Sequence, residues 1–124
     1  MRGPRPDRRP DRRRAERAGR RAEWIAAAFL TLKGYRIVAM RHRANGGEVD
    51  IVARRGSLAV MVEVKRRATA EAALMAVTHE AQRRIEAAGL AWLARQRDGA
   101  SLSTRNDIVA VVPWRWPAHY EDVW

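Results

Sequence analysis

The chain has 124 residues, enough for one ordinary domain with one hydrophobic core and too few for two. It contains no cysteine, which excludes disulfides, thiolate metal sites and a thiol nucleophile. The net charge is +11, carried by 23 arginines and two lysines against 14 acids, and its distribution along the chain is more informative than its size.

The N-terminal segment holds most of the excess charge, with ten arginines against three acids in residues 1–21. Residues 1–14 combine proline, glycine and like charge with almost nothing apolar, which predicts a disordered basic arm before a single domain at residues 15–124. Such an arm can bind phosphates in a salt-dependent way. A solubilising tail in an arginine-rich proteome explains the composition equally well.

The first predicted element is a helix, because apolar residues recur at spacings of four, three, four and three: Ala18, Ala22, Ile25, Phe29 and Leu32. It is expected to run from about Asp11 or Arg14 to Lys33, with Gly34 just past its end. Its apolar window is well short of the roughly 20 residues that span a bilayer, and the N-terminus lacks the apolar segment of a secretory signal. A cytoplasmic protein with no membrane partner is therefore expected.

Three strands are predicted next, at residues 35–43, 48–54 and 58–66, separated by 45-NGG-47 and by Gly56. An alanine-rich helix follows at residues 70–96, with a break near Thr78. One of its faces is predicted to cover the sheet: Ile85, Leu90, Trp92 and Leu93. The last strand, 107-DIVAVV-112, is apolar and typical of a buried strand. This order predicts an α/β fold, with a single mixed sheet flanked by helices.

The hairpin 47-GEVDIVARRGSLAVMVEVKRR-67 places carboxylates in strands that otherwise look buried. If Gly56 and Ser57 form a two-residue turn with glycine first, Asp50 lies directly opposite Glu63. Side-chain alternation then divides the residues between two faces: Glu48, Asp50, Glu63 and Lys65 on one, and Val49, Ile51, Val60, Val62 and Val64 on the other. Facing Cβ atoms lie only ~5 Å apart, so the two like charges destabilise the hairpin unless something compensates them.

Three compensations are open. A divalent cation such as Mg²⁺ or Mn²⁺ takes carboxylate oxygens and would make this a catalytic centre. Alternatively, Lys65 and neighbouring arginines neutralise the acids as a structural ion network. In the third case the turn is longer, the register slips, and the charges are scattered.

The pattern of Asp50 followed by Glu63, Val64 and Lys65 resembles the PD-(D/E)xK nucleases. From about residue 18 to the C-terminus, the chain resembles the YraN family of small proteins with the restriction-endonuclease-like fold. The segments that carry the resemblance are 23-EWIAAAFLTLKGY-35, 47-GEVDIVA-53, 62-VEVKRR-67, 82-QRRI-85 and 105-RNDIVAV-111. The chain departs from the pattern at Ala81, where relatives often carry lysine, and at Asn106, where they often carry an aromatic residue.

The resemblance implies a restriction-endonuclease-like core of order α-β-β-β-α-β and a site for Mg²⁺ or Mn²⁺. Asp50, Glu63 and the backbone carbonyl of Val64 would hold the metal. Lys65 would orient or deprotonate the attacking water, or stabilise the transition state. Glu23 would approach the metal through water, although helical projection puts it nearly opposite Ile25 and Phe29, where a solvated glutamate is ordinary.

The expected function is therefore that of a Mg²⁺-dependent, endonuclease-like phosphodiesterase acting on nucleic acid, with DNA favoured, in DNA processing or repair. The arginines expected to bind the nucleic-acid backbone are Arg41, Arg43, Arg66, Arg67, Arg83 and Arg84. By analogy alone, cutting two strands suggests a homodimer. The alternative is a non-catalytic nucleic-acid-binding accessory protein that keeps the nuclease fold.

The remaining polar residues favour structural roles. His42, His79 and His119 lack the spacing of metal ligands and are interpreted as surface or core histidines. Asp107 begins a buried strand beside Arg105, and a structural ion pair or strand-end cap is favoured over a direct catalytic role. The aromatic segment 114-WRWPAHYEDVW-124 could stack on unpaired bases, but packing against the core or a dimer contact is favoured.

Overall fold

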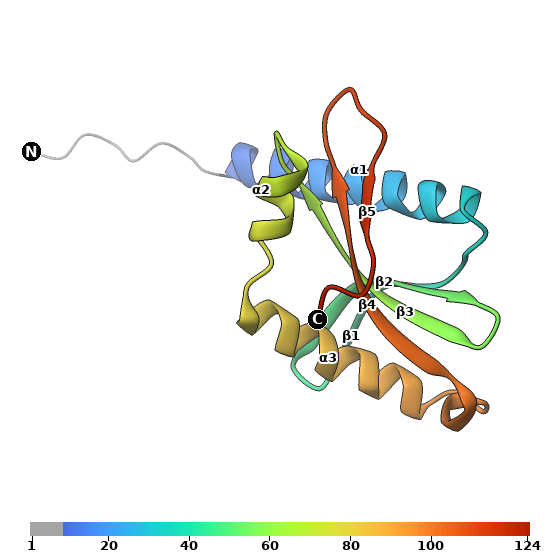
Figure 1. Ribbon diagram of the computed structural model, residues 1–124. Helices are drawn as coiled ribbons and strands as arrows, with labels where there is room; N and C mark the ends of the chain where they lie inside the picture. The colour runs from blue at the N-terminus through green and yellow to red at the C-terminus, as the bar shows by residue number, and fades with distance from the viewer. Residues whose placement is uncertain (1–8) are drawn as a thin grey trace, which may run out of the picture.

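The computed structural model describes residues 9–124, with side chains from Arg12 onward. A five-stranded sheet lies between helix α1 on one face and helix α3 on the other (Figure 1). The helices are α1 (Arg9–Leu32), α2 (Ala70–Met75), α3 (His79–Ala94) and the short 3₁₀ helix η1 (Gly99–Ser101). The strands are β1 (Arg36–Ala44), β2 (Gly47–Arg55), β3 (Leu58–Arg66), β4 (Ser103–Val111) and β5 (Ala118–Tyr120).

The sheet is mixed, and its strands follow one another in space in chain order. β1, β2 and β3 form an antiparallel meander, β4 runs parallel to β3, and β5 is antiparallel to β4. The predicted α/β class, single mixed sheet and element order are confirmed. The short strand β5 was not predicted, because three residues near a proline carry no periodic signal.

The helical ends also differ in part from the prediction. Helix α1 begins at Arg9, before the predicted start. The rest of the predicted basic arm, residues 1–8, lies outside the described residues. The predicted break near Thr78 is confirmed, because its side chain accepts a hydrogen bond from the N–H of Ala81 and caps α3.

Two apolar clusters hold the layers together. On the α1 side, small residues let the helix lie close to the sheet, where they pack with strand residues: Ala22, Ala26, Ala27 and Leu30 with Ile51, Val60, Val62 and Val109. On the α3 side, helix and strand residues also pack together: Ile85, Ala88 and Trp92 with Val49, Val52, Ala59 and Met61.

The predicted helix faces were only partly right. Ile25 and Leu32 were expected in the core, but they are 47% and 77% exposed. The close-packing alanines rotate α1 so that Glu23 lies at the edge of the buried face rather than in solvent. On α3, Ile85 and Trp92 are buried as predicted, whereas Leu90 is exposed.

The hairpin register is confirmed. Arg55 pairs with Leu58, and the ladder continues to Ile51 and Val62. Gly56 has a φ of +60°, which the first position of a type II′ turn requires. The predicted face of Val49 was wrong, because Val49 packs on the α3 side while Ile51 packs on the α1 side. The alternation thus breaks at Asp50.

Candidate functional site

The two acids lie where β2 and β3 separate. The paired ladder ends at Ile51 and Val62, one residue before Asp50 and Glu63. Beyond the ladder, the backbone N–H of Val64 in β3 donates a hydrogen bond of 2.8 Å to the side-chain Oδ2 of Asp50 in β2. On the other side of β2, the pairing with β1 skips Arg41, whose φ of +51° is in the left-handed region. The broken alternation of β2 thus falls at the residue that lies opposite Arg41 and where the pairing with β3 ends.

The backbone carbonyl of Val64 faces the same gap. In an extended strand the N–H and C=O of one residue project to the same side, since paired residues exchange both bonds. The N–H of Val64 points to Asp50, so its carbonyl projects toward β2 beyond the last ladder pair. Two carboxylates and a carbonyl oxygen therefore converge at the end of the hairpin.

Glu63 is the most perturbed acid of the site. Its side chain is only 13% exposed, and Nζ of Lys65 lies 3.7 Å from its Oε1. Burial, and then the neighbouring Asp50 carboxylate, raise the pKa of Glu63 to about 8, although Lys65 acts in the opposite direction. Lys65 therefore offsets only part of the rise in pKa that burial and Asp50 cause.

Glu23 reaches the site through Arg41. Oε2 of Glu23, on α1, lies 2.6 Å from Nε of Arg41, and the glutamate side chain is 13% exposed. The hydrogen bond that Arg41 donates to Glu23 raises the pKa of Arg41 above its usual value, and the charges of Glu48 and Asp50 add to the effect. Arg41 thus links α1 to the edge of the candidate site through its ion pair with Glu23.

The donor set fits a magnesium-like ion. Among the described side chains, no group of three or more histidines and acids is placed to hold a metal. A cation here would depend on Asp50, Glu63, the Val64 carbonyl and water. Mg²⁺ is commonly held in this way, by one or two carboxylates while it keeps several waters.

The predicted nucleic-acid-binding arginines lie on or directly after three elements, β1, β3 and α3. Arg43 and Arg84 line the same hollow beside the β1–β2 turn. Nε of Arg43 also lies 3.5 Å from Oε1 of Glu48. Arg66 and Arg67 are exposed at the end of β3, next to the acids in sequence. Arg83 is exposed on α3.

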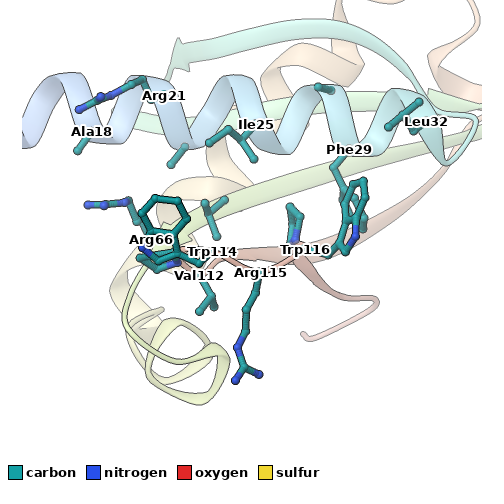
Figure 2. Close-up of a pocket in the computed structure, with 15 residues that line it drawn as sticks. Ala18, Arg21, Ile25, Phe29, Leu32, Arg66, Val112, Trp114, Arg115 and Trp116 are labelled. Carbon is teal, nitrogen blue, oxygen red and sulfur yellow. The ribbon is translucent and has the colours of Figure 1, made fainter.

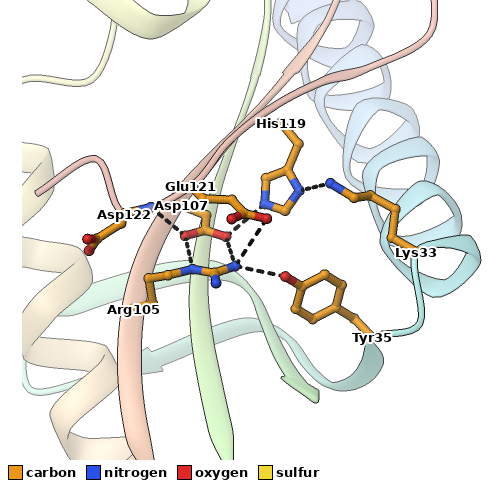
Figure 3. A network of polar contacts seen from close by, with 7 residues as sticks. All are labelled: Lys33, Tyr35, Arg105, Asp107, His119, Glu121 and Asp122. Atoms are coloured by element: carbon orange, nitrogen blue, oxygen red, sulfur yellow. Dashed lines mark hydrogen bonds and ion pairs between the residues drawn. The ribbon is translucent and has the colours of Figure 1, made fainter.

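A second polar network surrounds the buried Asp107 (Figure 3). Arg105 donates to both carboxylate oxygens of Asp107 at 2.8 Å, which confirms the predicted pair. His119 Nε2 lies 2.7 Å from Asp107 Oδ2 and its Nδ1 lies 2.6 Å from Lys33 Nζ. Because lysine only donates, Nδ1 accepts and Nε2 carries the proton. Tyr35 accepts from Arg105, and the partners of this network are too distant in sequence to predict.

A groove of about 780 Å³ opens between α1 and the segment between β4 and β5 (Figure 2). Its walls include Ile25, Phe29 and Leu32 of α1 and Trp114 and Trp116 of the segment. Trp114 is fully exposed and Trp116 is 79% exposed, so the prediction that this segment packs down was wrong for both. Trp124, in contrast, is partly buried and packs against the α3-side cluster.

Comparison with known proteins finds close relatives. The model of a family described as "Uncharacterised protein family UPF0102" matches residues 22–111. The UPF0102 protein mlr4633 of Mesorhizobium japonicum is 58% identical over 109 residues, 88% of this chain and 87% of the relative. The UPF0102 protein R00337 of Rhizobium meliloti is 57% identical over 122 residues, 98% of each chain. In residues 9–124, no helix has the length and apolar character to cross a membrane.

Proposed function

Since this chain belongs to the uncharacterised protein family UPF0102, which is the YraN family, we propose its function from its own side chains: a metal-dependent nuclease that hydrolyses phosphodiester bonds. The observation that carries the proposal is the half-buried pair of Asp50 and Glu63. Burial, and then the neighbouring Asp50 carboxylate, raise the pKa of Glu63 to about 8 even with Lys65 nearby. A cation between the two carboxylates would favour the ionised form of both.

Asp50, Glu63 and the carbonyl of Val64 would hold the ion, with Mg²⁺ or Mn²⁺ as the candidates. A bound ion of this kind polarises a phosphoryl oxygen and lowers the pKa of bound water. The hydrogen bond from Val64 to Asp50 fixes one carboxylate before any ion arrives. This rigidity supports catalysis, because the ligands need little reorganisation.

Lys65 is the candidate for proton handling and charge stabilisation. Its ammonium lies 3.7 Å from Glu63 and is 26% exposed, so it can reach both the acids and an incoming phosphate. Lys65 would orient the attacking water or stabilise the charge that develops on the phosphoryl oxygens. Arg66 and Arg67 follow it and would hold the backbone phosphates.

The proposed substrate is nucleic acid, with DNA favoured, and the proposed setting is DNA processing or repair in the cytoplasm. A homodimer would allow both strands of a duplex to be cut, since one such site cuts one strand. The second candidate is an accessory protein that binds nucleic acid without cutting it. The exposed arginines of β3 and α3 support that function as well, because they could bind phosphates whether or not Asp50 and Glu63 hold a metal.

The deciding experiment is a cleavage assay with Mg²⁺ or Mn²⁺ on single-stranded, duplex, flapped and branched DNA and on RNA. Asp50→Asn and Lys65→Ala are expected to reduce cleavage by at least about 100-fold. Lys33→Ala is the matched control, because the only other lysine contacts His119 and not the acids. Cleavage that survives in both site variants would refute the site assignment. Binding with no metal-dependent cleavage would favour the accessory protein.

A further inference from the structure

We propose that the groove between α1 and residues 112–117 binds single-stranded nucleic acid, with Trp114 and Trp116 stacking on bases and arginines contacting phosphates. This inference rests on the proposed function and names its substrate class. It assigns a role to the two tryptophans that the candidate metal site does not use.

The first argument is the exposure of the two indole rings. Trp114 is fully exposed and Trp116 is 79% exposed, at alternate positions of one short segment. Large apolar side chains left in water forgo the free energy of burial, so an exposed pair suggests a binding surface. Figure 2 shows both rings along the segment that faces α1 across the groove.

The second argument is backbone strain. Trp114 has a φ of +65°, in the left-handed region that bulky side chains rarely adopt. Such a conformation costs about 1–3 kcal/mol and is concentrated at ligand-binding sites. The chain thus adopts a disfavoured backbone in order to present an unburied indole.

The third argument is charge. The residues that line the groove include Arg21, Arg66 and Arg115 and no acid. An apolar floor of Ile25 and Phe29 with a wholly positive rim suits a ligand that alternates flat aromatic rings with phosphates. Unpaired bases stack on aromatic side chains irrespective of sequence, while the neighbouring arginines contact the backbone.

The fourth argument is position. Arg66, which lines the groove, directly follows Lys65 of the candidate site in β3. Consecutive Cα atoms are about 3.8 Å apart, so the groove and the acids share one strand end. Lys65 and Arg66 project to opposite faces of the sheet, so a single strand held in the groove would reach Asp50 and Glu63 by passing round this end of β3, while a duplex would keep its bases from the indoles.

The test is the affinity for a fluorescent oligothymidine of roughly 12 nucleotides, measured by anisotropy in EDTA so that cleavage cannot contribute. Trp114→Ala and Trp116→Ala are each expected to weaken binding by about tenfold, with little change for a duplex of the same length. Arg115→Gln is expected to lower the salt slope of single-strand binding by about 0.7. Trp24→Ala is the matched control, because Trp24 is 66% exposed but does not line the groove.

The proposal would be overturned if a variant carrying both Trp114→Ala and Trp116→Ala bound the single strand as tightly as the wild type does. It would also be overturned if the wild-type protein did not bind the oligonucleotide. The same holds if the tryptophan variants changed only self-association or binding to lipid vesicles. Circular dichroism and melting temperatures of the variants show whether the fold is intact. Tryptophan-dependent binding with no cleavage on any substrate would refute the nuclease and leave this inference standing. Metal-dependent cleavage, together with single-strand binding that does not depend on the tryptophans, would support the nuclease and refute the role of the groove.

Discussion

The N–H of Val64 donates a hydrogen bond of 2.8 Å to the Asp50 carboxylate, across the gap where β2 and β3 separate. The bond takes the place of the next ladder bond and holds the Asp50 side chain between the two strands. A carboxylate has about four lone-pair sites, so this bond leaves room for a cation. Asp50 is therefore prepositioned next to Glu63, and the following predictions depend on that geometry.

Glu63→Gln is expected to stabilise the metal-free protein at pH 8 by roughly 1–3 kcal/mol. The pKa of Glu63 is raised from 4.5 to about 8, so between these values the folded protein keeps a proton that the unfolded chain has lost. Wild-type stability should fall with rising pH across this window, and the variant should lack that fall. Urea unfolding in EDTA at several pH values measures it. Glu71→Gln, in an exposed part of α2, is the control, and equal pH slopes in wild type and Glu63→Gln would contradict the prediction.

Mg²⁺ or Mn²⁺ at pH 8 is expected to raise the melting temperature of the wild-type protein. An ion at 100 times its dissociation constant adds about 2.7 kcal/mol to the free energy of unfolding, which corresponds to several degrees. Asp50→Asn and Glu63→Gln remove a ligand and should abolish the shift. Asp98→Asn, an exposed acid paired with Arg54, should retain it. A shift of equal size in Asp50→Asn would mean that the ion binds elsewhere.

Asp107→Asn is expected to lower the free energy of unfolding at pH 7 by about 3–5 kcal/mol, because it leaves the half-buried Arg105 without its carboxylate. Burial would raise the pKa of Asp107, but hydrogen bonds from His119, Arg105 and the N–H of Asp122 hold it at about 2. The stabilisation should be complete above the ordinary pKa of 3.8 and should be lost as the pH falls through 2. Tyr35→Phe, which removes one hydrogen bond, should cost only about 1 kcal/mol. Chemical denaturation across this pH range checks both variants, and a loss below 1 kcal/mol for Asp107→Asn would show that the network contributes little.

Gly47→Ala is expected to cost about 1–3 kcal/mol by overpacking. A Cβ at Gly47 would overlap the backbone carbonyl of Arg84, so β2 and α3 could not keep their close approach. Gly19→Ala, in α1, would meet nothing within 4 Å and should stabilise the helix by about 0.5–1 kcal/mol. Thermal melts of the two variants should therefore move in opposite directions. A stabilised Gly47→Ala would show that α3 can move away from the strand.

The hairpin was the part of the molecule best predicted from sequence. Its register depends on local chemistry, since Gly56 fixes the turn and each later pair follows by counting. The face of Val49 was predicted incorrectly because the alternation of β2 breaks at Asp50, opposite Arg41 of the neighbouring strand, whose backbone is in the left-handed region. No alternation rule within β2 contains that information.

The candidate site was predicted less completely. Asp50, Glu63 and Lys65 do lie together, but the partnership of Glu23 with Arg41 depends on how α1 rotates against the sheet. The small residues Ala22 and Ala26 pack against the sheet and set that rotation. The periodicity of apolar residues instead predicted that the bulkier Ile25 and Leu32 would face the core. The exposure of Trp114 and Trp116 depends on a segment whose backbone has no periodic pattern to read.

The two-residue turn at Gly56 and Ser57 has a consequence for how this chain can vary. Five paired positions separate the turn from the acids, so it lies at the opposite end of the hairpin from the candidate site. Surface loops usually tolerate added residues. Here a single inserted residue would slip β3 against β2 and send Glu63 and Lys65 to the other face of the sheet. The turn is therefore constrained in its length and, at Gly56, in its residue type, and the site depends on a loop that it never touches.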